Sequence, residues 1–318
     1  MKYVFGIDVG GTNIKIGLFD ENKILVSKTL LKTNTTLKGK YVVSELKTKI
    51  EQILSVNKIT LEAVLGLGIG VPGPVKDNFI IRCPNLGWEN KDLAKELQAE
   101  FKKELLVLVS NDASVAAYGE YNHLKSEKDI VFMTLGTGVG GAVIIDQKIV
   151  EGKHGSGGEI GHIQVRYDEP KQCSCGLYGC LETTASIRGI RWIAEELLLN
   201  YQKPTILTAS KLTPKTIFAA ALKNDELALE IVEEVATYIA KACAKIALVV
   251  DPALFIIGGG ISQAGQILLD AIKRNYLKYS YFATREVEFA LAKLGNDAGM
   301  YGASELVFKN KEKDESNK

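Results

Sequence analysis

The sequence predicts a mixed α/β protein built from two similar halves. Its 318 residues are about twice the length of a typical domain, which leaves room for two separate cores. Segments rich in β-branched and aromatic residues alternate with helical patterns along the whole chain. Residues 4–26 also resemble residues 131–150 at an offset of about 126, with Gly10 matching Gly136. The alternative to a duplication is that hairpins with glycine turns look alike by chance.

Each half is expected to begin with a strand hairpin and to continue with strands that alternate with helices. Runs of β-branched and aromatic residues predict strands at 3–7, 14–19, 23–28, 64–69, 105–109, 130–135, 142–145 and 254–257. Apolar residues with helical spacing predict helices at 41–54, 91–101, 113–124, 184–199, 225–248, 264–275 and 300–308. Residues 311–318 are nearly all polar and cannot bury enough surface to order themselves, so a disordered tail is expected there.

The overall composition is that of an ordinary globular protein. Hydrophobic residues make up 46% of the chain, and 39 basic against 38 acidic residues give a net charge of +1. This balance implies neither a nucleic-acid nor a membrane partner. No apolar run is long enough for a signal peptide or a membrane span, which predicts a cytoplasmic protein.

Glycine is concentrated in four loops, at residues 8–13, 66–73, 136–141 and 258–260. Glycine lets backbone N–H groups approach an anion closely, as a phosphate-binding loop requires. Two loops match G-x-G-x-x-G, but neither opens a helix, as a dinucleotide-binding loop must. No P-loop motif occurs. The remaining interpretation is a phosphate loop in a hairpin, in which the motif D-x-G-G-T joins two strands. A second such turn lies in the other half. An ordinary tight turn is the alternative for any one loop.

A candidate general base follows the strand predicted at 105–109. This strand leads into Ser110-Asn111-Asp112, and a helix follows. Phosphoryl transfer to an alcohol needs a carboxylate that accepts the proton as the oxygen attacks, and Asp112 is placed to do so at the end of a buried strand. The alternative is that Asn111 or Asp112 only caps the helix.

A metal site is indicated by His162, Cys173, Cys175 and Cys180. Three thiolates and one imidazole complete a tetrahedral zinc site with no open position, so the ion would be structural. Clustered cysteines in a chain without a secretion signal favour a metal over disulfides. The alternatives are chance clustering and a buried histidine with another partner.

The glycine loops resemble the nucleotide motifs of the actin-like ATPases. The first phosphate motif of that superfamily is similar to Asp8-Val9-Gly10-Gly11-Thr12-Asn13, the second to Gly136-Thr137-Gly138, and the adenosine motif to Gly258-Gly259-Gly260. The resemblance implies a two-lobed actin-like ATPase fold, ribonuclease H-like and of the hexokinase type, with duplicated mixed β-sheet domains. Residues 1–115 would form a small lobe, onto which a helix at about 300–310 packs back. Residues 116–299 would form a large lobe with the nucleotide site and the zinc site.

The segment G-E-x-G-H at 158–162, followed by C-x-C-G-x-x-G-C-x-E at 173–182, resembles the ROK family of sugar kinases and repressors. The resemblance implies hydrogen bonds to a sugar from Gly73, Asn85, Asn111, Asp112, Glu159, His162 and Glu182. Asp8 would help to hold Mg²⁺ with ATP, and Thr12 and Thr137 would contact phosphates. His162 would use one ring nitrogen for zinc and offer the other to the sugar.

These resemblances imply an ATP-dependent hexose kinase with Mg²⁺ and a structural Zn²⁺, and glucose is the expected substrate. Fructose, mannose, N-acetylglucosamine and N-acetylmannosamine remain alternatives. A sugar-responsive repressor is the second hypothesis, although only seven residues precede Asp8 and leave no room for a helix-turn-helix domain. A non-catalytic ATPase is the third, but it leaves the sugar and zinc motifs unexplained. A homodimer or homotetramer is expected, with the apolar face of residues 225–248 as a possible contact unless that face is core.

Overall fold

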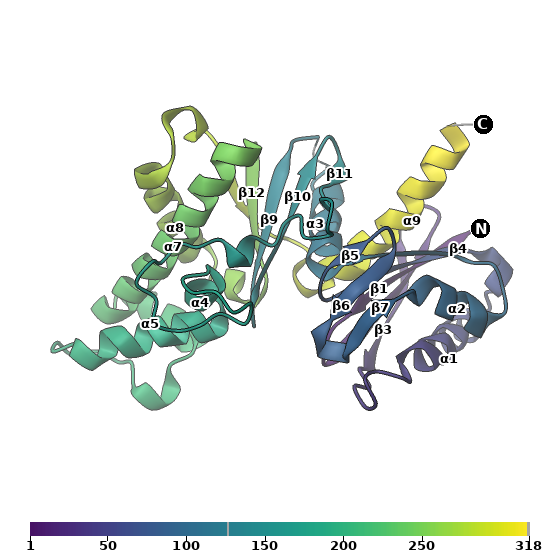
Figure 1. Cartoon of the computed structure of the whole chain (residues 1–318), viewed down its shortest axis with the longest axis horizontal. Helices are drawn as coiled ribbons and strands as arrows, with labels where there is room; N and C mark the ends of the chain where they lie inside the picture. The colour runs from purple at the N-terminus through teal and green to yellow at the C-terminus, as the bar shows by residue number, and fades with distance from the viewer. Residues whose placement is uncertain (126, 317–318) are drawn as a thin grey trace. The chain divides into compact units, whose positions relative to one another are not determined.

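The computed structural model describes residues 1–125 and 127–316, which divide into two compact units (Figure 1). Within the described part, unit 1 comprises residues 1–125, Ile149–Gly157 and 296–316. Unit 2 comprises Glu127–Lys148 and Gly158–Gly295. The expected boundary after residue 115 lies inside a helix, α3, that belongs to unit 1 throughout, because it packs along the C-terminal helix.

Unit 1 is built on a sheet with the strand order β3-β2-β1-β4-β8. Its strands are β1 (Tyr3–Val9), β2 (Asn13–Asp20), β3 (Leu25–Lys32), β4 (Val64–Val71) and β8 (Leu106–Asn111). The first three strands are antiparallel neighbours, whereas β1, β4 and β8 run parallel. Because parallel strands end at the same edge of a sheet, the loops that follow β1, β4 and β8 meet there.

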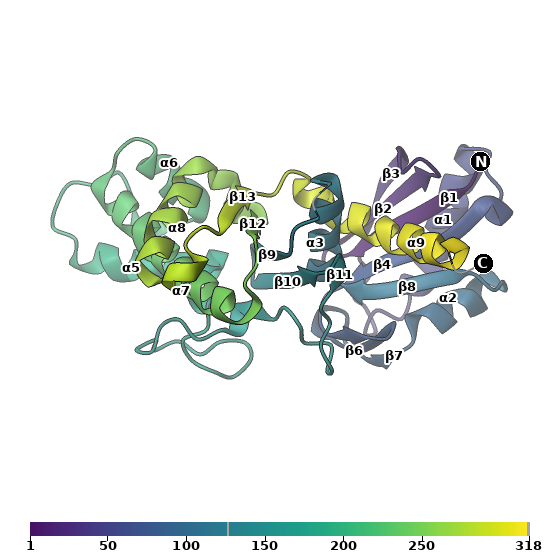
Figure 2. The same cartoon turned by 90° about the horizontal axis from the view of Figure 1, so that it is seen from above.

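Helices cover both faces of this sheet. They are α1 (Val42–Val56), α2 (Leu93–Phe101), α3 (Asp112–His123) and α9 (Ala298–Ser316). In β1, alternate side chains point to opposite faces. Phe5 and Ile7 share a core with α1 and α2, whereas Val4 packs with Met300 and Val307 of α9. Figure 2 shows α9 running along the sheet.

Close backbone packing joins α9 to α3. A Cβ atom at Gly302 of α9 would lie 1.7 Å from the carbonyl oxygen of Val115 and 2.6 Å from the backbone nitrogen of Gly119, both in α3. No side chain fits at this distance, so glycine lets the two helices touch. The contact matters for function because Asp112 begins α3 and α9 begins beside Asp8.

We expect Gly302→Ala to destabilise the protein by about 1–3 kcal/mol, because the added methyl group must push α3 and α9 apart. Urea unfolding measures the loss. The matched control is Asn310→Ala on the same helix, which should change the free energy of unfolding by no more than about 0.5 kcal/mol. Equal midpoints for Gly302→Ala and the wild type would show that the helices are not packed so closely.

Unit 2 repeats the sheet topology of unit 1, with the strand order β11-β10-β9-β12-β13. Its strands are β9 (Ile130–Leu135), β10 (Val139–Ile145), β11 (Lys148–Ile149), β12 (Leu254–Gly258) and β13 (Glu288–Leu291). Here too the first three strands in the chain are consecutive in the sheet, and β9, β12 and β13 run parallel. Equal strand orders support the internal duplication expected from residues 4–26 and 131–150.

The helices of unit 2 are α4 (Glu182–Ala185), α5 (Ile187–Asn200), α6 (Pro214–Ala221), α7 (Glu226–Val250) and α8 (Gln266–Tyr279). They share a core with one face of the sheet, where Val131 and Met133 of β9 lie. The apolar face of α7 belongs to this core, so little of it is left for contact between subunits. Leu248 and Val249 at its end stay exposed.

Some of the observed elements differ from the sequence predictions. A separate small sheet, β5 (Val75–Lys76), β6 (Phe79–Cys83) and β7 (Trp88–Lys91), was not expected. The helix expected at 184–199 is interrupted at Ser186, whose extended backbone and side chain cap α5 through the N–H of Gly189. Among the described residues, no helix has the length and apolarity to cross a membrane.

The disordered tail expected at 311–318 is wrong for residues 311–316, which continue α9 as far as Ser316. Residues 317 and 318 lie outside the described residues. A packed helix has already overcome the cost of nucleation, so each further turn adds hydrogen bonds without burying apolar surface. An ion pair between Glu312 and Lys23, which lies between β2 and β3, is 3.4 Å long and also holds this extension in place.

Candidate active site

The carboxyl ends of the parallel strands in unit 1 bring several predicted residues to one edge of the sheet. Asp8 of β1 lies opposite Gly70 of β4, and Gly70 lies opposite Ser110 of β8. Beyond these positions, β1 leads into the first glycine turn, β4 leads into the turn at Gly73, and β8 leads into Asp112. This edge is where open α/β sheets bind ligands.

The structure separates the roles of Asn111 and Asp112. The Asn111 side chain caps α3 by accepting the N–H of Ser114 at 3.1 Å, and its amide donates to the carbonyl of Gly73 at 3.0 Å. Asp112 is the first residue of α3, and its Oδ1 accepts the N–H of Ala113 at 2.8 Å. The capping role therefore belongs to Asn111, which leaves general-base chemistry open to Asp112.

Asn85 borders the same part of unit 1. It lies in a single 3₁₀ turn, Pro84–Leu86, and its side chain packs on Gly11, where a Cβ atom would be 3.4 Å away. Burial, with a smaller contribution from the negative charge of Asp112, raises the pKa of the neighbouring Cys83 thiol to about 11. Asp112 therefore lies close enough to Cys83, two residues before Asn85, for its charge to act on the thiol.

The first glycine turn, between β1 and β2, is fixed by its own backbone and by Thr33. The N–H of Gly10 donates to the carbonyl of Asn13 at 3.0 Å. Thr33 donates its hydroxyl to the carbonyl of Gly10 at 2.6 Å and its N–H to the carbonyl of Thr12 at 2.9 Å. Neighbouring Asp8 forms an ion pair with Lys15, 3.0 Å long.

Sequence reasoning missed Lys15. A signal was present, because a tight hairpin between Asp8 and Lys15 places the two side chains opposite each other on one face of the sheet. Lys15 thus places a positive charge beside the Asp8 carboxylate.

The second glycine turn and the glycines after β12 lie together in unit 2. The N–H of Gly136 donates to the carbonyl of Gly138 at 2.9 Å and closes the turn around Thr137. Gly259, directly after β12, packs against the backbone of Leu135, the residue before the turn. Both predicted nucleotide elements therefore meet at the carboxyl ends of β9 and β12, with Gly260 beginning a 3₁₀ turn.

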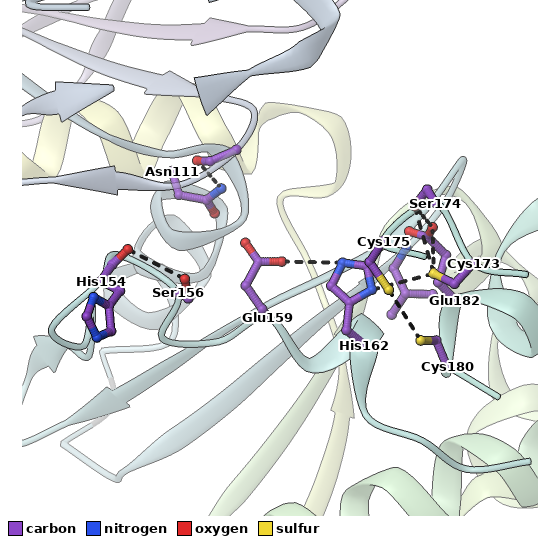
Figure 3. Close-up of polar contacts among 12 residues, drawn as sticks. Asn111, His154, Ser156, Glu159, His162, Cys173, Ser174, Cys175, Cys180 and Glu182 are labelled. Atoms are coloured by element: carbon purple, nitrogen blue, oxygen red, sulfur yellow. Dashed lines mark hydrogen bonds and ion pairs between the residues drawn. The ribbon is translucent and has the colours of Figure 1, made fainter. Parts of the chain in front are cut away.

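His162 and the three cysteines form a cluster suited to a metal ion (Figure 3). The Nδ1 atom of His162 lies 3.6 Å from the sulfur of Cys173, and the sulfurs of Cys175 and Cys180 are 3.6 Å apart. All four donor atoms lie within 4.8 Å of one another. A tetrahedral zinc site with Zn–S bonds near 2.3 Å separates its sulfurs by about 3.8 Å, so the cluster fits such an ion.

The other side of the His162 ring faces Glu159. The Nε2 atom of His162 lies 3.9 Å from a carboxylate oxygen of Glu159, and Figure 3 shows Glu159 pointing toward the ring. The segment is held on the β10 hairpin by Gly161, where a Cβ atom would lie only 2.0 Å from the carbonyl oxygen of Val139. Glycine at this position of the G-E-x-G-H motif therefore lets the backbone touch the strand.

Glu182, the first residue of α4, lies between the cysteines and the second glycine turn. One of its carboxylate oxygens accepts the hydroxyl of Ser174 at 2.8 Å, and the other accepts the N–H of Val139 at 3.2 Å. The sequence predicted Glu182 but gave no sign of its two partners. Contacts of this kind depend on how the cysteine loop folds back, which spacing along the chain does not encode.

The predicted site residues therefore form two groups, one in each unit. Unit 1 brings together Asp8, Gly10, Gly11, Thr12, Asn13, Gly73, Asn85, Asn111 and Asp112. Unit 2 holds Gly136, Thr137, Gly138, Glu159, His162, Cys173, Cys175, Cys180, Glu182, Gly258, Gly259 and Gly260.

Comparison with known proteins identifies the family of this chain. The ROK family model matches residues 4–310. The chain is 37% identical to a glucokinase of Halalkalibacterium halodurans over 96% of this chain and 95% of that protein. It is 34% identical to a glucokinase of Thermotoga maritima, with 96% of each protein covered.

The crystal structure of a ROK family glucokinase from Streptomyces griseus, in complex with glucose and AMPPNP, is similar to this one. The TM-score is 0.76 at 30% identity, and 96% of this chain and 98% of that chain are covered. Such neighbours are ROK sugar kinases with the actin-like ATPase fold, which confirms the fold class predicted from the glycine loops. With the family model covering nearly the whole chain, the chain belongs to the ROK family.

Proposed function

We propose that the protein is an ATP-dependent glucokinase that transfers the γ-phosphate of Mg-ATP to the 6-hydroxyl of glucose. The observation that carries the proposal is the arrangement at Asn111 and Asp112. A carboxylate follows a parallel strand at the sheet edge where ligands bind, while its neighbour performs the capping. The identity of 37% to a glucokinase over 95% of that protein supports glucose as the acceptor.

In the proposed reaction, the 6-hydroxyl oxygen of glucose forms a bond to the γ-phosphorus as the bond to the β,γ-bridging oxygen breaks and ADP leaves. Asp112 accepts the hydroxyl proton, which raises the nucleophilicity of the oxygen. Gly73, Asn85 and Asn111 of unit 1 contribute hydrogen bonds to the sugar. Glu159, His162 and Glu182 of unit 2 contribute the others, and carboxylates suit this role because they accept from neighbouring hydroxyls.

The nucleotide is proposed to be held by the two glycine turns and by Gly258, Gly259 and Gly260. Backbone N–H groups of such turns bind phosphate oxygens. A Mg²⁺ ion bound with ATP would neutralise phosphate charge. Asp8 is proposed to hold it, because its carboxylate lies directly before the first glycine turn.

The Cys₃His cluster is proposed to hold a structural Zn²⁺. The ion would cross-link the loop at residues 173–180 to His162 and would have no open position for substrate. The ion would fix His162 directly. It would also hold Glu159 through His162 and Glu182 through Ser174 of the same loop.

We also propose a homodimer or homotetramer in the cytoplasm. Leu248 and Val249 at the end of α7 are 62% and 86% exposed, and they are apolar side chains of α7 left for contact with another subunit. Light scattering after size-exclusion chromatography measures the mass. A monomer at micromolar concentration would contradict this part of the proposal.

A coupled assay of ADP release across a panel of sugars tests the proposed function. We expect ADP release that depends on glucose, with kcat/KM for glucose above the values for fructose, mannose, N-acetylglucosamine and N-acetylmannosamine. A higher kcat/KM for one of these sugars would support the proposed kinase activity but would identify that sugar, not glucose, as the substrate. ADP release without sugar indicates a non-catalytic ATPase, and sugar binding without ADP release indicates a sugar sensor. Either result would overturn the proposal.

A further inference from the structure

The second glycine turn is held at both ends by the segment that follows the last cysteine. The N–H of Val139, at the end of the turn, donates to Glu182 at 3.2 Å. The carbonyl of Gly136, at its start, accepts the N–H of Ile187 at 2.8 Å. Glu182 and Ile187 begin α4 and α5, so the position of this helical segment sets the shape of the turn.

Glu182 is in turn held by the cysteine loop. Ser174, between Cys173 and Cys175, donates its hydroxyl to one oxygen of Glu182 at 2.8 Å, and the sulfur of Cys173 lies 3.8 Å from the same oxygen. The other oxygen of Glu182 accepts the N–H of Val139 and packs against Gly138. Because both oxygens are engaged, the carboxylate keeps one orientation.

We propose that Ser174 is a positioning residue for nucleotide binding, which acts by holding Glu182 against the second glycine turn. The Cys₃His cluster fixes Ser174, Ser174 fixes Glu182, and Glu182 fixes the N–H of Val139. The shape of the turn thus depends on the metal-binding loop. Preorganised N–H groups bind an anion more tightly than mobile ones do, because less ordering remains to be done on binding. The inference rests on the proposed phosphate-binding role of the turn.

The Ser174→Ala variant tests this in the full-length, zinc-loaded protein. We expect the Kd for AMPPNP, measured by isothermal titration calorimetry, to rise about fivefold, as the loss of one net hydrogen bond predicts. Ser174→Thr keeps the hydroxyl and should restore the wild-type Kd. The matched control is Gln172→Ala, which removes the hydrogen bond from Gln172 to the carbonyl of Gly176 in the same loop without touching Glu182. Its Kd for AMPPNP should match that of the wild type.

Zinc content is measured for every variant, because a change in Kd that accompanies loss of zinc reports on the metal cluster and not on the Ser174 hydroxyl. Ser174→Ala with full zinc content and a raised Kd that Ser174→Thr restores supports the inference. Ser174→Ala with full zinc content and an unchanged Kd would overturn it alone. An equal rise for Gln172→Ala would also overturn it, since the effect would then belong to general loosening of the loop. Wild-type protein that binds no AMPPNP would overturn the proposed function together with this inference.

Discussion

Replacing Asp112 with Asn is expected to lower kcat by at least about 10²–10⁴-fold, while the KM values for glucose and ATP stay close to those of the wild type. The Asn side chain has the same shape, and its oxygen can still accept the N–H of Ala113, as Oδ1 of Asp112 does. It cannot take a proton from the sugar hydroxyl. The start of α3 should survive the change because Asn111, not Asp112, caps the helix.

The control for this variant is Asp92→Asn. Asp92 is a carboxylate at a helix start in the same unit, where it caps α2 by accepting the N–H of Lys95 at 3.0 Å. Its replacement should leave kcat within about twofold and cost less than about 1 kcal/mol of stability. Steady-state kinetics and calorimetric glucose binding are measured for both variants. Unchanged turnover in Asp112→Asn would refute the assignment of the base.

Regular elements with strong local signals were predictable from the sequence. The hairpin of β1 and β2, the strand β8 and the long helix α7 follow from alternating or helical apolar spacing. The small sheet of β5, β6 and β7 has strands as short as Val75–Lys76, too short to show any alternation. The break at Ser186 depends on a cap to Gly189 that competes with an otherwise helical pattern.

The candidate site was predictable where its functional residues lie close together in the sequence. The cysteine motif, the G-E-x-G-H segment and Asn111-Asp112 each lie within a few residues of sequence. The partners that hold them come from distant segments. Asn111 reaches Gly73 across 38 residues, and Glu182 reaches Val139 across 43 residues. Such contacts depend on strand order, which one sequence read locally does not determine.

For the Cys₃His cluster, the sequence predicted the donor atoms but not the residues that the cluster holds in place. Its donor atoms are close enough for one ion, as the sequence motif suggested. Whether the ion governs catalysis depends on what the cluster holds, and the structure identifies those contacts as Glu159 through His162 and Glu182 through Ser174. Loss of the metal should therefore affect substrate binding before it affects the general base, since Asp112 belongs to the other unit.

Metal removal, by a chelator or by Cys180→Ser, is expected to lower kcat/KM for glucose by roughly 100-fold, because Glu159 and Glu182 lose the loop that positions them. The sulfur of Cys180 lies in a buried residue, 1% exposed, and faces that of Cys175, so its loss opens the site. Added Zn²⁺ should restore the chelated protein but not Cys180→Ser.

The control is Cys243→Ala, which removes a fully buried thiol of α7 outside the cluster and should keep both zinc and the KM for glucose. Metal analysis and kinetics together decide the outcome, and metal-free protein with full turnover and an unchanged KM would rule out a positioning role for the ion.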